Sequence, residues 1–232
     1  MNTILTVPFT LPREEIQTQL ALKPGSSFET SLGILFNQVE EVGRPKAIYR
    51  VSYIEERGTD TVTMDDIILH SSALRSNLDQ IGRVFPFVAT CGAEVDEIPL
   101  EQGDVLKQYW LNTIKMALLQ ASLEHLRQIL KNRYRLENLS AMNPGSGEAS
   151  IWPIEEQGLL FSLFGGTQII EHEIGVRLLP SYLMVPEMSV SGILFPSETN
   201  YYNCQLCQRE DCPGRRAHFD PHLWENIQEG GK

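Results

Sequence analysis

The sequence lacks the features that membrane-spanning and nucleic-acid-binding proteins require. No apolar run is long enough to cross a bilayer, and the N-terminus shows no cleavable signal. Basic residues are fewer than acidic ones, 19 against 30, and the formal net charge is −11. No basic excess is therefore present to meet the phosphates of a nucleic acid. These absences predict a cytoplasmic protein that binds neither a membrane nor a nucleic acid.

Signatures of common catalytic sites are also missing. The chain has no phosphate-binding loop of the G-x4-G-K-[ST] kind, no serine nucleophile elbow, no recognisable catalytic triad and no internal repeat. Its 232 residues, 42% of them hydrophobic and 21% charged, are typical of a globular protein with one large domain or two small ones. The residues alone predict a mixed α+β fold and no particular reaction.

Cysteine is scarce, but three of the four cysteines stand close together. Cys204, Cys207 and Cys212 follow the pattern C-x2-C-x4-C, and a reducing compartment disfavours disulfides. A C-x2-C pair brings two thiolates within reach of one zinc ion or one iron–sulfur cluster, so the pattern predicts a metal site. A loop of reduced cysteines without a ligand is the alternative. The fourth ligand position could be open or filled from elsewhere in the chain, by Cys91, His218 or His222.

Two cations follow the cysteines. Arg215 and Arg216 come directly after Pro213-Gly214, which interrupts regular structure. Positive charge beside thiols favours the thiolate form, and it also favours an anionic partner.

Hydrophobic periodicity predicts most of the secondary structure. The most regular patterns predict a helix that follows the capping-box pattern at residues 26–29 and ends at Gly43, a helix over residues 104–132 and a buried strand over residues 84–91. Residues 47–54 and 61–70 are expected to pair as one hairpin through a polar turn at residues 55–60. Residues 176–184 are expected to form one strand, and the tail from Pro221 is expected to be frayed.

The stretch from Met184 to Arg216 is the most unusual in the chain. Residues 189–195 predict a strand, and Gly192 inside it marks a place where another backbone or a ligand comes close. If Tyr201 and Tyr202 lie in an extended segment, they point to opposite faces, so that one can be buried while the other lines a groove. The small residues from Ser140 to Gly147 predict a loop whose amides could approach a ligand.

These same residues carry a resemblance to a known family. The chain from Ile174 to Tyr202 resembles the end of the activation domain of cobalamin-dependent methionine synthase, and the cysteine segment is similar to small stand-alone relatives found with corrinoid methyl-transfer systems. The shared features, in chain order, are Pro144-Gly145, Trp152, a helix ending at Gly165, Ile174-Gly175, Met184-Val185-Pro186, Ser189-Val190-Ser191-Gly192, Phe195 and Tyr201-Tyr202.

The resemblance implies a fold and a function. The fold is α+β, a bent antiparallel sheet flanked by helices, with an activation-domain-like unit over residues 1–203 and a cysteine-containing segment and tail over residues 204–232. The function is that of an accessory protein for reductive reactivation of a corrinoid (cobalamin) methyltransferase, to whose cobalamin the chain presents S-adenosylmethionine. The cobalamin would come only on the partner protein, and the electron from a flavodoxin or a ferredoxin-like donor. The alternative is a metal or iron–sulfur docking and electron-transfer module for a corrinoid protein.

The resemblance also assigns the ligand site. Tyr201 and Tyr202 match the family's tyrosine pair on the ligand side, and Pro144 and Gly145 match the Pro-Gly of its R-x-x-P-G-Y loop. Two positions of that loop differ, because Ala141 stands in place of the arginine and Ser146 in place of the tyrosine. The cations upstream that could take the place of the arginine are Arg133 and Arg135, and Arg135 is the predicted one.

Overall fold

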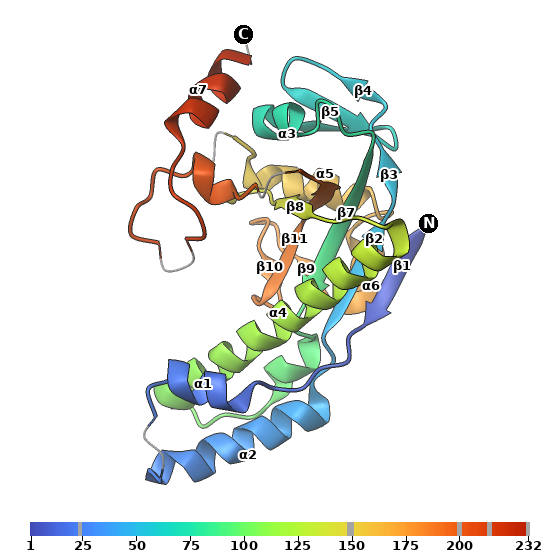
Figure 1. Ribbon diagram of the computed structural model, residues 1–232. Helices are drawn as coiled ribbons and strands as arrows, with labels where there is room; N and C mark the ends of the chain where they lie inside the picture. The colour runs from blue at the N-terminus through green and yellow to red at the C-terminus, as the bar shows by residue number, and fades with distance from the viewer. Residues whose placement is uncertain (23–24, 148–150, 199–200, 213–214, 231–232) are drawn as a thin grey trace.

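The sheet at the centre of the fold is antiparallel, and its neighbouring strands come from distant parts of the chain (Figure 1). The computed structural model describes all residues except 23–24, 148–150, 199–200, 213–214 and 231–232. The predicted fold class, an α+β fold with an antiparallel sheet flanked by helices, is confirmed. In spatial order the strands are β1 (Asn2–Thr6), β2 (Lys46–Arg50), β7 (Arg83–Thr90), β11 (Ser189–Pro196) and β8 (Leu139–Met142), with β3 (Ser52–Tyr53) also paired to β7.

The side chains of β7 alternate between the two faces of this sheet. Phe85 and Phe87 belong to the hydrophobic cluster on one face, and Val88 belongs to the cluster on the other. Helices α2 (Ser27–Val42) and α4 (Val105–Tyr134) cover the first face. Burial on both faces is the reason that β7 is apolar along nearly its whole length.

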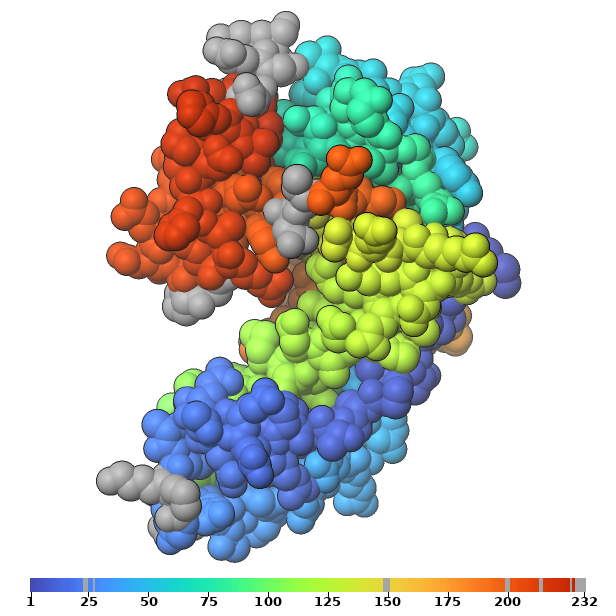
Figure 2. All heavy atoms as spheres, viewed as in Figure 1, coloured from blue at the N-terminus to red at the C-terminus, as the bar shows by residue number. Residues whose placement is uncertain are grey.

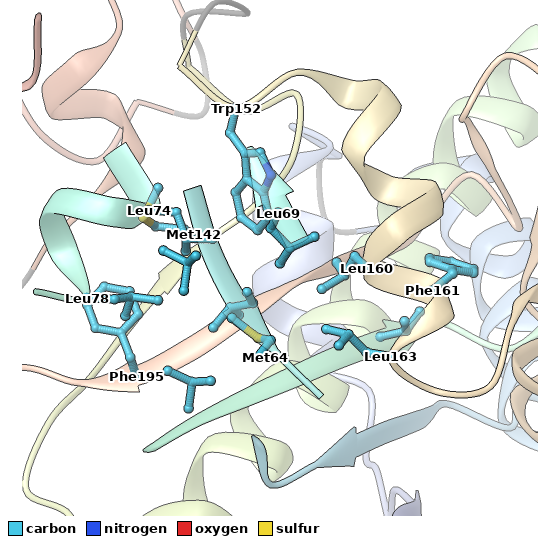
Figure 3. Close-up of a cluster of buried hydrophobic side chains, with 14 of the residues drawn as sticks. Met64, Leu69, Leu74, Leu78, Met142, Trp152, Leu160, Phe161, Leu163 and Phe195 are labelled. Atoms are coloured by element: carbon cyan, nitrogen blue, oxygen red, sulfur yellow. The ribbon is translucent and has the colours of Figure 1, made fainter. Parts of the chain in front are cut away.

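The second face carries the other hydrophobic cluster, shown in Figure 3. Helices α3 (Ser72–Asn77), α5 (Gln157–Ser162) and α6 (Thr167–Ile174) pack against it, together with a small three-stranded sheet. The segment after residue 203 contributes Leu206 and Ile227 to the same cluster. Both faces of the central sheet are therefore buried.

The remaining elements are short. They are α1 (Arg13–Gln19), β4 (Glu56–Arg57), β5 (Thr61–Met64), β6 (Ile67–His70), η1 (Ala93–Glu97), η2 (Ile154–Glu156), β9 (Arg177–Leu178), β10 (Met184–Val185), η3 (Asn203–Leu206) and α7 (Pro221–Gly230). Among the described residues, no helix is both long enough and apolar enough to span a membrane.

The expected hairpin of residues 47–54 with 61–70 is wrong. Strand β2 pairs with β1 and β7, whereas residues 61–70 fold back on themselves as β5 and β6. The reversal lies at Asp65 and Asp66, both of which have positive φ, 50° and 61°. Aspartate tolerates this left-handed region better than most residues, so two aspartates supply the turn that a continuous strand would exclude.

The expected strand over residues 176–184 is also interrupted. Arg177–Leu178 pairs with Met184–Val185, and the backbone N–H of Leu179 donates to the carbonyl of Leu183 at 2.8 Å. Pro180 follows Leu179 and cannot donate to a sheet ladder, which ends the first strand there.

The prediction of a frayed tail is wrong for the described part of residues 221–230. Helix α7 packs against α3 and buries Ile227. Its N-terminus is capped by Asp220, whose carboxylate accepts the backbone N–H groups of His222 and Leu223, each at 3.1 Å. Apolar burial and a cap together hold the helix in place.

Candidate functional site

A cleft of about 990 Å³ opens at the β8 edge of the sheet. Its walls come from the second half of α4, from β8 and the turn after it, from β10 and β11, and from residues 201–204 with Arg216. Figure 2 shows the hollow between the C-terminal segment, in red, and the middle of α4, in yellow-green. A volume near the upper end of the usual range for small-molecule sites is large enough for a nucleoside with an amino-acid side arm.

One stripe of α4 forms a wall of this cleft. Gln120, Leu123, Glu124, Arg127 and Lys131 line it, at the three- and four-residue spacings that put side chains on one helix face. The neighbouring stripe is apolar and buried, as at Leu126 and Leu130. A single helix thus packs the sheet with one stripe and presents polar groups to the cleft with the next.

The turn that follows β8 holds the predicted Pro144 and Gly145. Both line the cleft, and the backbone N–H of Gly145 donates to the carbonyl of Trp152 at 2.8 Å. Gly145 has φ +70°, and a Cβ added to it would lie 2.9 Å from Cδ1 of Ile154. The turn therefore needs glycine for its conformation and for the space beside Ile154.

Gly192 permits a close approach of the β8 backbone to β11. A Cβ at this position would lie 2.3 Å from the carbonyl oxygen of Met142 and 2.5 Å from Nδ2 of Asn143. The expected close approach at Gly192 is thus an approach of the β8 backbone to β11. It brings the β8 turn and the last central strand together at the cleft.

A chain of polar side chains fixes this junction. Asn143 donates from Nδ2 to the carbonyl of Ser191 at 2.7 Å, and the Ser191 hydroxyl donates to Oε1 of Gln157 at 3.1 Å. Gln157 in turn donates to the carbonyl of Tyr182 at 2.9 Å. Ser191 and Gln157 are buried, and a buried, satisfied network of this kind holds one geometry. Sequence reasoning did not identify Asn143 or Gln157.

Tyr201 and Tyr202 differ in their surroundings. Tyr201 is 8% exposed and packs against Phe195, whereas Tyr202 is 37% exposed. Burial raises the pKa of the Tyr201 phenol, and a hydrogen bond with Asn77 on α3 offsets part of this increase. One ring is therefore buried and the other accessible, as expected, but both tyrosines line the cleft, which the prediction reserved for one of them.

Arg215 holds together the described residues around the three cysteines. The guanidinium of Arg215 donates to the carbonyls of Cys204 at 3.3 Å, of Cys207 at 2.8 Å and of Ala217 at 2.9 Å. The backbone N–H of Arg216 lies 3.4 Å from the Sγ atom of Cys204. The carbonyl oxygens of the cysteine loop thus converge on a cation.

The predicted metal ligands are in two places. Cys204, Cys207 and Cys212 are partly exposed, and Cys204 lines the cleft. Cys91 lies after β7 in the cluster under α2 and α4, fully buried, and burial raises its pKa to about 12. In the described part of the chain, no three cysteine, histidine or acidic side chains gather as a metal site requires. Metal binding at these cysteines therefore stays a prediction.

The predicted Arg135 lies outside the set of described residues that line the cleft. It is the C-cap of α4, exposed and left-handed with φ 54°. The cations that do line the cleft are Arg127, Lys131 and Arg216. Sequence reasoning noted Arg216 only for its position beside the cysteines and did not single out Arg127, because no local pattern distinguishes it on a long helix.

Comparison with solved structures identifies a known protein of similar fold. Neither the protein-family models nor the curated proteins gave a match to this chain. Among solved structures, the chain is similar to the MetH reactivation domain in its crystal structure bound to AdoHcy, with a TM-score of 0.61 and 16% sequence identity. The match covers 87% of this chain and 80% of that one. The chain therefore shares its fold with the MetH reactivation domain, and the resemblance to the methionine synthase activation domain is confirmed at the level of fold.

Proposed function

We propose that this chain binds S-adenosylmethionine in the cleft beside β8 and presents it to a corrinoid carried by a partner protein. One observation carries the proposal. The Pro144-Gly145 turn and the Tyr201-Tyr202 pair, which the resemblance assigned to one ligand site, both line the same cleft. The relative of matching fold was crystallised with AdoHcy, the product of methyl transfer from S-adenosylmethionine.

The residues of the cleft fit such a ligand. The accessible ring of Tyr202 offers a face on which an adenine could stack. The turn at Gly145 brings backbone close to the cleft without a side chain in the way. Leu123, Leu183 and Val190 supply apolar surface, and Glu124 and Arg127 supply charges of both signs. Apolar walls with a few placed polar groups are the usual composition of a small-molecule site.

The chemistry asks little of this chain beyond positioning. On the partner, an electron from a reduced flavodoxin or ferredoxin-like donor and the methyl group of S-adenosylmethionine would restore the methylated corrinoid and leave AdoHcy. The corrinoid is the nucleophile, so the cleft needs no acid–base pair. Its residues would have to hold the methyl donor in one orientation with the sulfonium exposed to the partner, and orientation alone can lower a barrier by several kcal/mol, about 7–11 in the best cases.

The first experiment is calorimetric titration of AdoHcy into the protein. We expect saturable binding that Tyr202→Ala weakens by roughly 5- to 150-fold, the range expected for loss of one base–aromatic stack. Tyr53→Ala is the matched control, because Tyr53 is 61% exposed and is not among the cleft residues. Absence of binding at millimolar AdoHcy would overturn the proposal.

A second measurement tests the corrinoid partner. In an assay with an oxidised corrinoid methyltransferase, a chemical reductant and S-adenosylmethionine, the chain should increase the yield of methylated corrinoid. Tyr202→Ala should reduce this increase in proportion to its loss of affinity for AdoHcy. Binding of AdoHcy without any effect on the corrinoid would separate ligand binding from reactivation.

A further inference from the structure

The cleft concentrates positive charge in an acidic protein. The chain has 19 basic against 30 acidic residues, yet the described lining of the cleft includes Arg127, Lys131 and Arg216 against the carboxylates of Glu124 and Glu187. Arg127 comes from α4, and Arg216 comes from the C-terminal segment on the other side. The two guanidinium groups are close enough that Arg216 lowers the pKa of Arg127, an effect second to that of burial.

Arg127 is fixed but not neutralised. One of its guanidinium nitrogens donates to the carbonyl of Leu139 at 2.8 Å, which anchors the side chain beside the start of β8. No carboxylate of the described residues lies within 4.0 Å of Arg127 or Arg216. Glu124 lies one turn earlier on α4, and its carboxylate instead accepts a hydrogen bond from Gln128 at 3.0 Å. Burial of a cation costs free energy, and so does its repulsion by a second cation nearby. A bound anion would offset both costs.

Strand β8, which lies beside Arg127, carries no charged side chain. Leu139 and Ala141 both pack toward the cluster under α4, and the side chain of Ala141 ends at Cβ. Ser140 and Met142 are the other residues of β8. The helix, not the strand, therefore supplies the charge on this side of the cleft.

We propose that Arg127, with Arg216 facing it, forms an anion subsite that takes the carboxylate at the amino-acid end of the ligand. This inference rests on the proposed function, because it states which end of an S-adenosylmethionine-type ligand lies toward α4, namely the end with the carboxylate. The planar fork of an arginine can donate two parallel hydrogen bonds to a carboxylate. Within the part of the chain that the structure describes, the guanidinium of Arg127 makes one side-chain hydrogen bond, to the carbonyl of Leu139, so its other N–H groups can take this geometry. The subsite makes the cleft select for ligands that carry this carboxylate.

The test compares two ligands that differ in that group alone. S-adenosylmethionine and its decarboxylated form share the adenosine, the sulfonium and the amine. We expect the wild type to bind S-adenosylmethionine about 10- to 100-fold more tightly, the range for a hydrogen bond to a charged group. Arg127→Gln should bring this ratio close to one, and Arg216→Gln should reduce it by a smaller factor because its side chain is exposed.

Lys131→Gln is the matched control. Lys131 lines the cleft one turn further along the same helix, so its loss changes the overall charge of the cleft by the same amount. It should leave the ligand ratio unchanged, and an equal effect of Lys131→Gln would mean general attraction in place of a subsite. If Arg127→Gln weakens both ligands equally, the role of Arg127 is to hold β8 and the inference fails, while the proposed function stands. If the wild type binds neither ligand, both fail.

Discussion

The backbone N–H of Tyr201 donates a hydrogen bond to the side-chain oxygen of Ser140 at 3.0 Å, joining residues that are 61 positions apart. Ser140 is buried on β8, at the edge of the sheet, and Tyr201 begins the C-terminal segment. The bond therefore ties the tyrosine pair to the strand that leads into the Pro144-Gly145 turn. This contact links the two predicted parts of the ligand site directly.

Ser140→Ala should damage the site and the fold together. It leaves the buried N–H of Tyr201 without this acceptor, which costs about 1–3 kcal/mol of the free energy of unfolding. We also expect weaker binding of AdoHcy, because the tyrosine segment is no longer fixed to β8. Denaturant unfolding and calorimetry measure the two effects. Ser162→Ala is the control, since Ser162 is exposed and its hydroxyl donates within the same helical segment, to the carbonyl of Gly158. Equal losses in both variants would contradict the prediction.

Gly192→Ala should be strongly destabilising. Its Cβ would overlap the carbonyl oxygen of Met142, so β8 and β11 would have to separate, and overpacking of this kind typically costs about 1–3 kcal/mol or more. Gly33→Ala, on helix α2 with open space around it, should instead stabilise the protein by about 0.5–1 kcal/mol. Chemical denaturation of both variants gives the comparison. A stable Gly192→Ala protein would show that the strands can separate without cost.

Substitution of Tyr201 should mainly affect stability, and substitution of Tyr202 should mainly affect AdoHcy binding. Tyr201→Ala removes a buried ring and should lower the free energy of unfolding by about 3–5 kcal/mol. Tyr202→Ala removes an accessible ring and should change it by less than about 0.5 kcal/mol, while weakening AdoHcy binding. Thermal unfolding and calorimetry on each variant test this division. A loss of stability in Tyr202→Ala as large as in Tyr201→Ala would mean that both rings serve the core.

Asp104 should make stability depend on pH in the acid range. Its carboxylate caps α4 by accepting the backbone N–H of Lys107 at 2.9 Å and pairs with the Nζ atom of the same residue at 3.0 Å. These contacts, the backbone one first, hold the pKa of Asp104 below its usual 3.8. A lowered folded-state pKa stabilises the fold above the unfolded value and loses this effect as pH falls through the folded value.

The matched variant for this effect is Asp104→Asn, which can still cap the helix but does not titrate. The wild type should be the more stable at neutral pH, and the difference should shrink below about pH 4, where the unfolded carboxyl takes up its proton. Urea unfolding across this range measures the difference. If the difference in free energy of unfolding between wild type and Asp104→Asn stays constant with pH, the contribution of Asp104 comes from the geometry of the cap and not from its charge.

The cysteine segment should determine the metal content, if the predicted site exists. Zinc or iron measured in anaerobically purified protein should fall in Cys207→Ser, because one of the paired thiolates is lost. Cys91 is ruled out as the fourth ligand because it is buried in the cluster under α2 and α4, away from the other three cysteines. His218→Ala and His222→Ala therefore test the remaining candidates, and the variant that also lowers the metal content identifies the ligand. Visible absorbance distinguishes an iron–sulfur cluster from zinc. Equal metal content in wild type and Cys207→Ser would contradict the prediction.

Several parts of the fold and the site were predictable because their signals are local. The apolar periodicity of α4 and of β7 reflects which side chains are buried, and it can be read without knowing what covers them. Gly145 and Gly192 are required by backbone conformation or by space, and a missing side chain in an apolar context marks such positions. The turn at Asp65 and Asp66 was missed because two aspartates beside apolar residues also fit an exposed strand position.

The sequence by itself determined the helix and strand periods and the glycine positions, and its resemblance to the activation domain predicted that the Pro144-Gly145 turn and the tyrosine pair share one ligand site. Only the tertiary structure decided that Arg127 and Arg216 face one cleft, that Cys91 is buried under α2 and α4, and that α7 packs on α3. Hydrophobic periodicity and backbone sterics depend on residues that are close together in the sequence, so they can be recognised in a short stretch of it. Which distant surfaces meet depends on strand order and on packing across the sheet, and no short stretch of sequence contains that information.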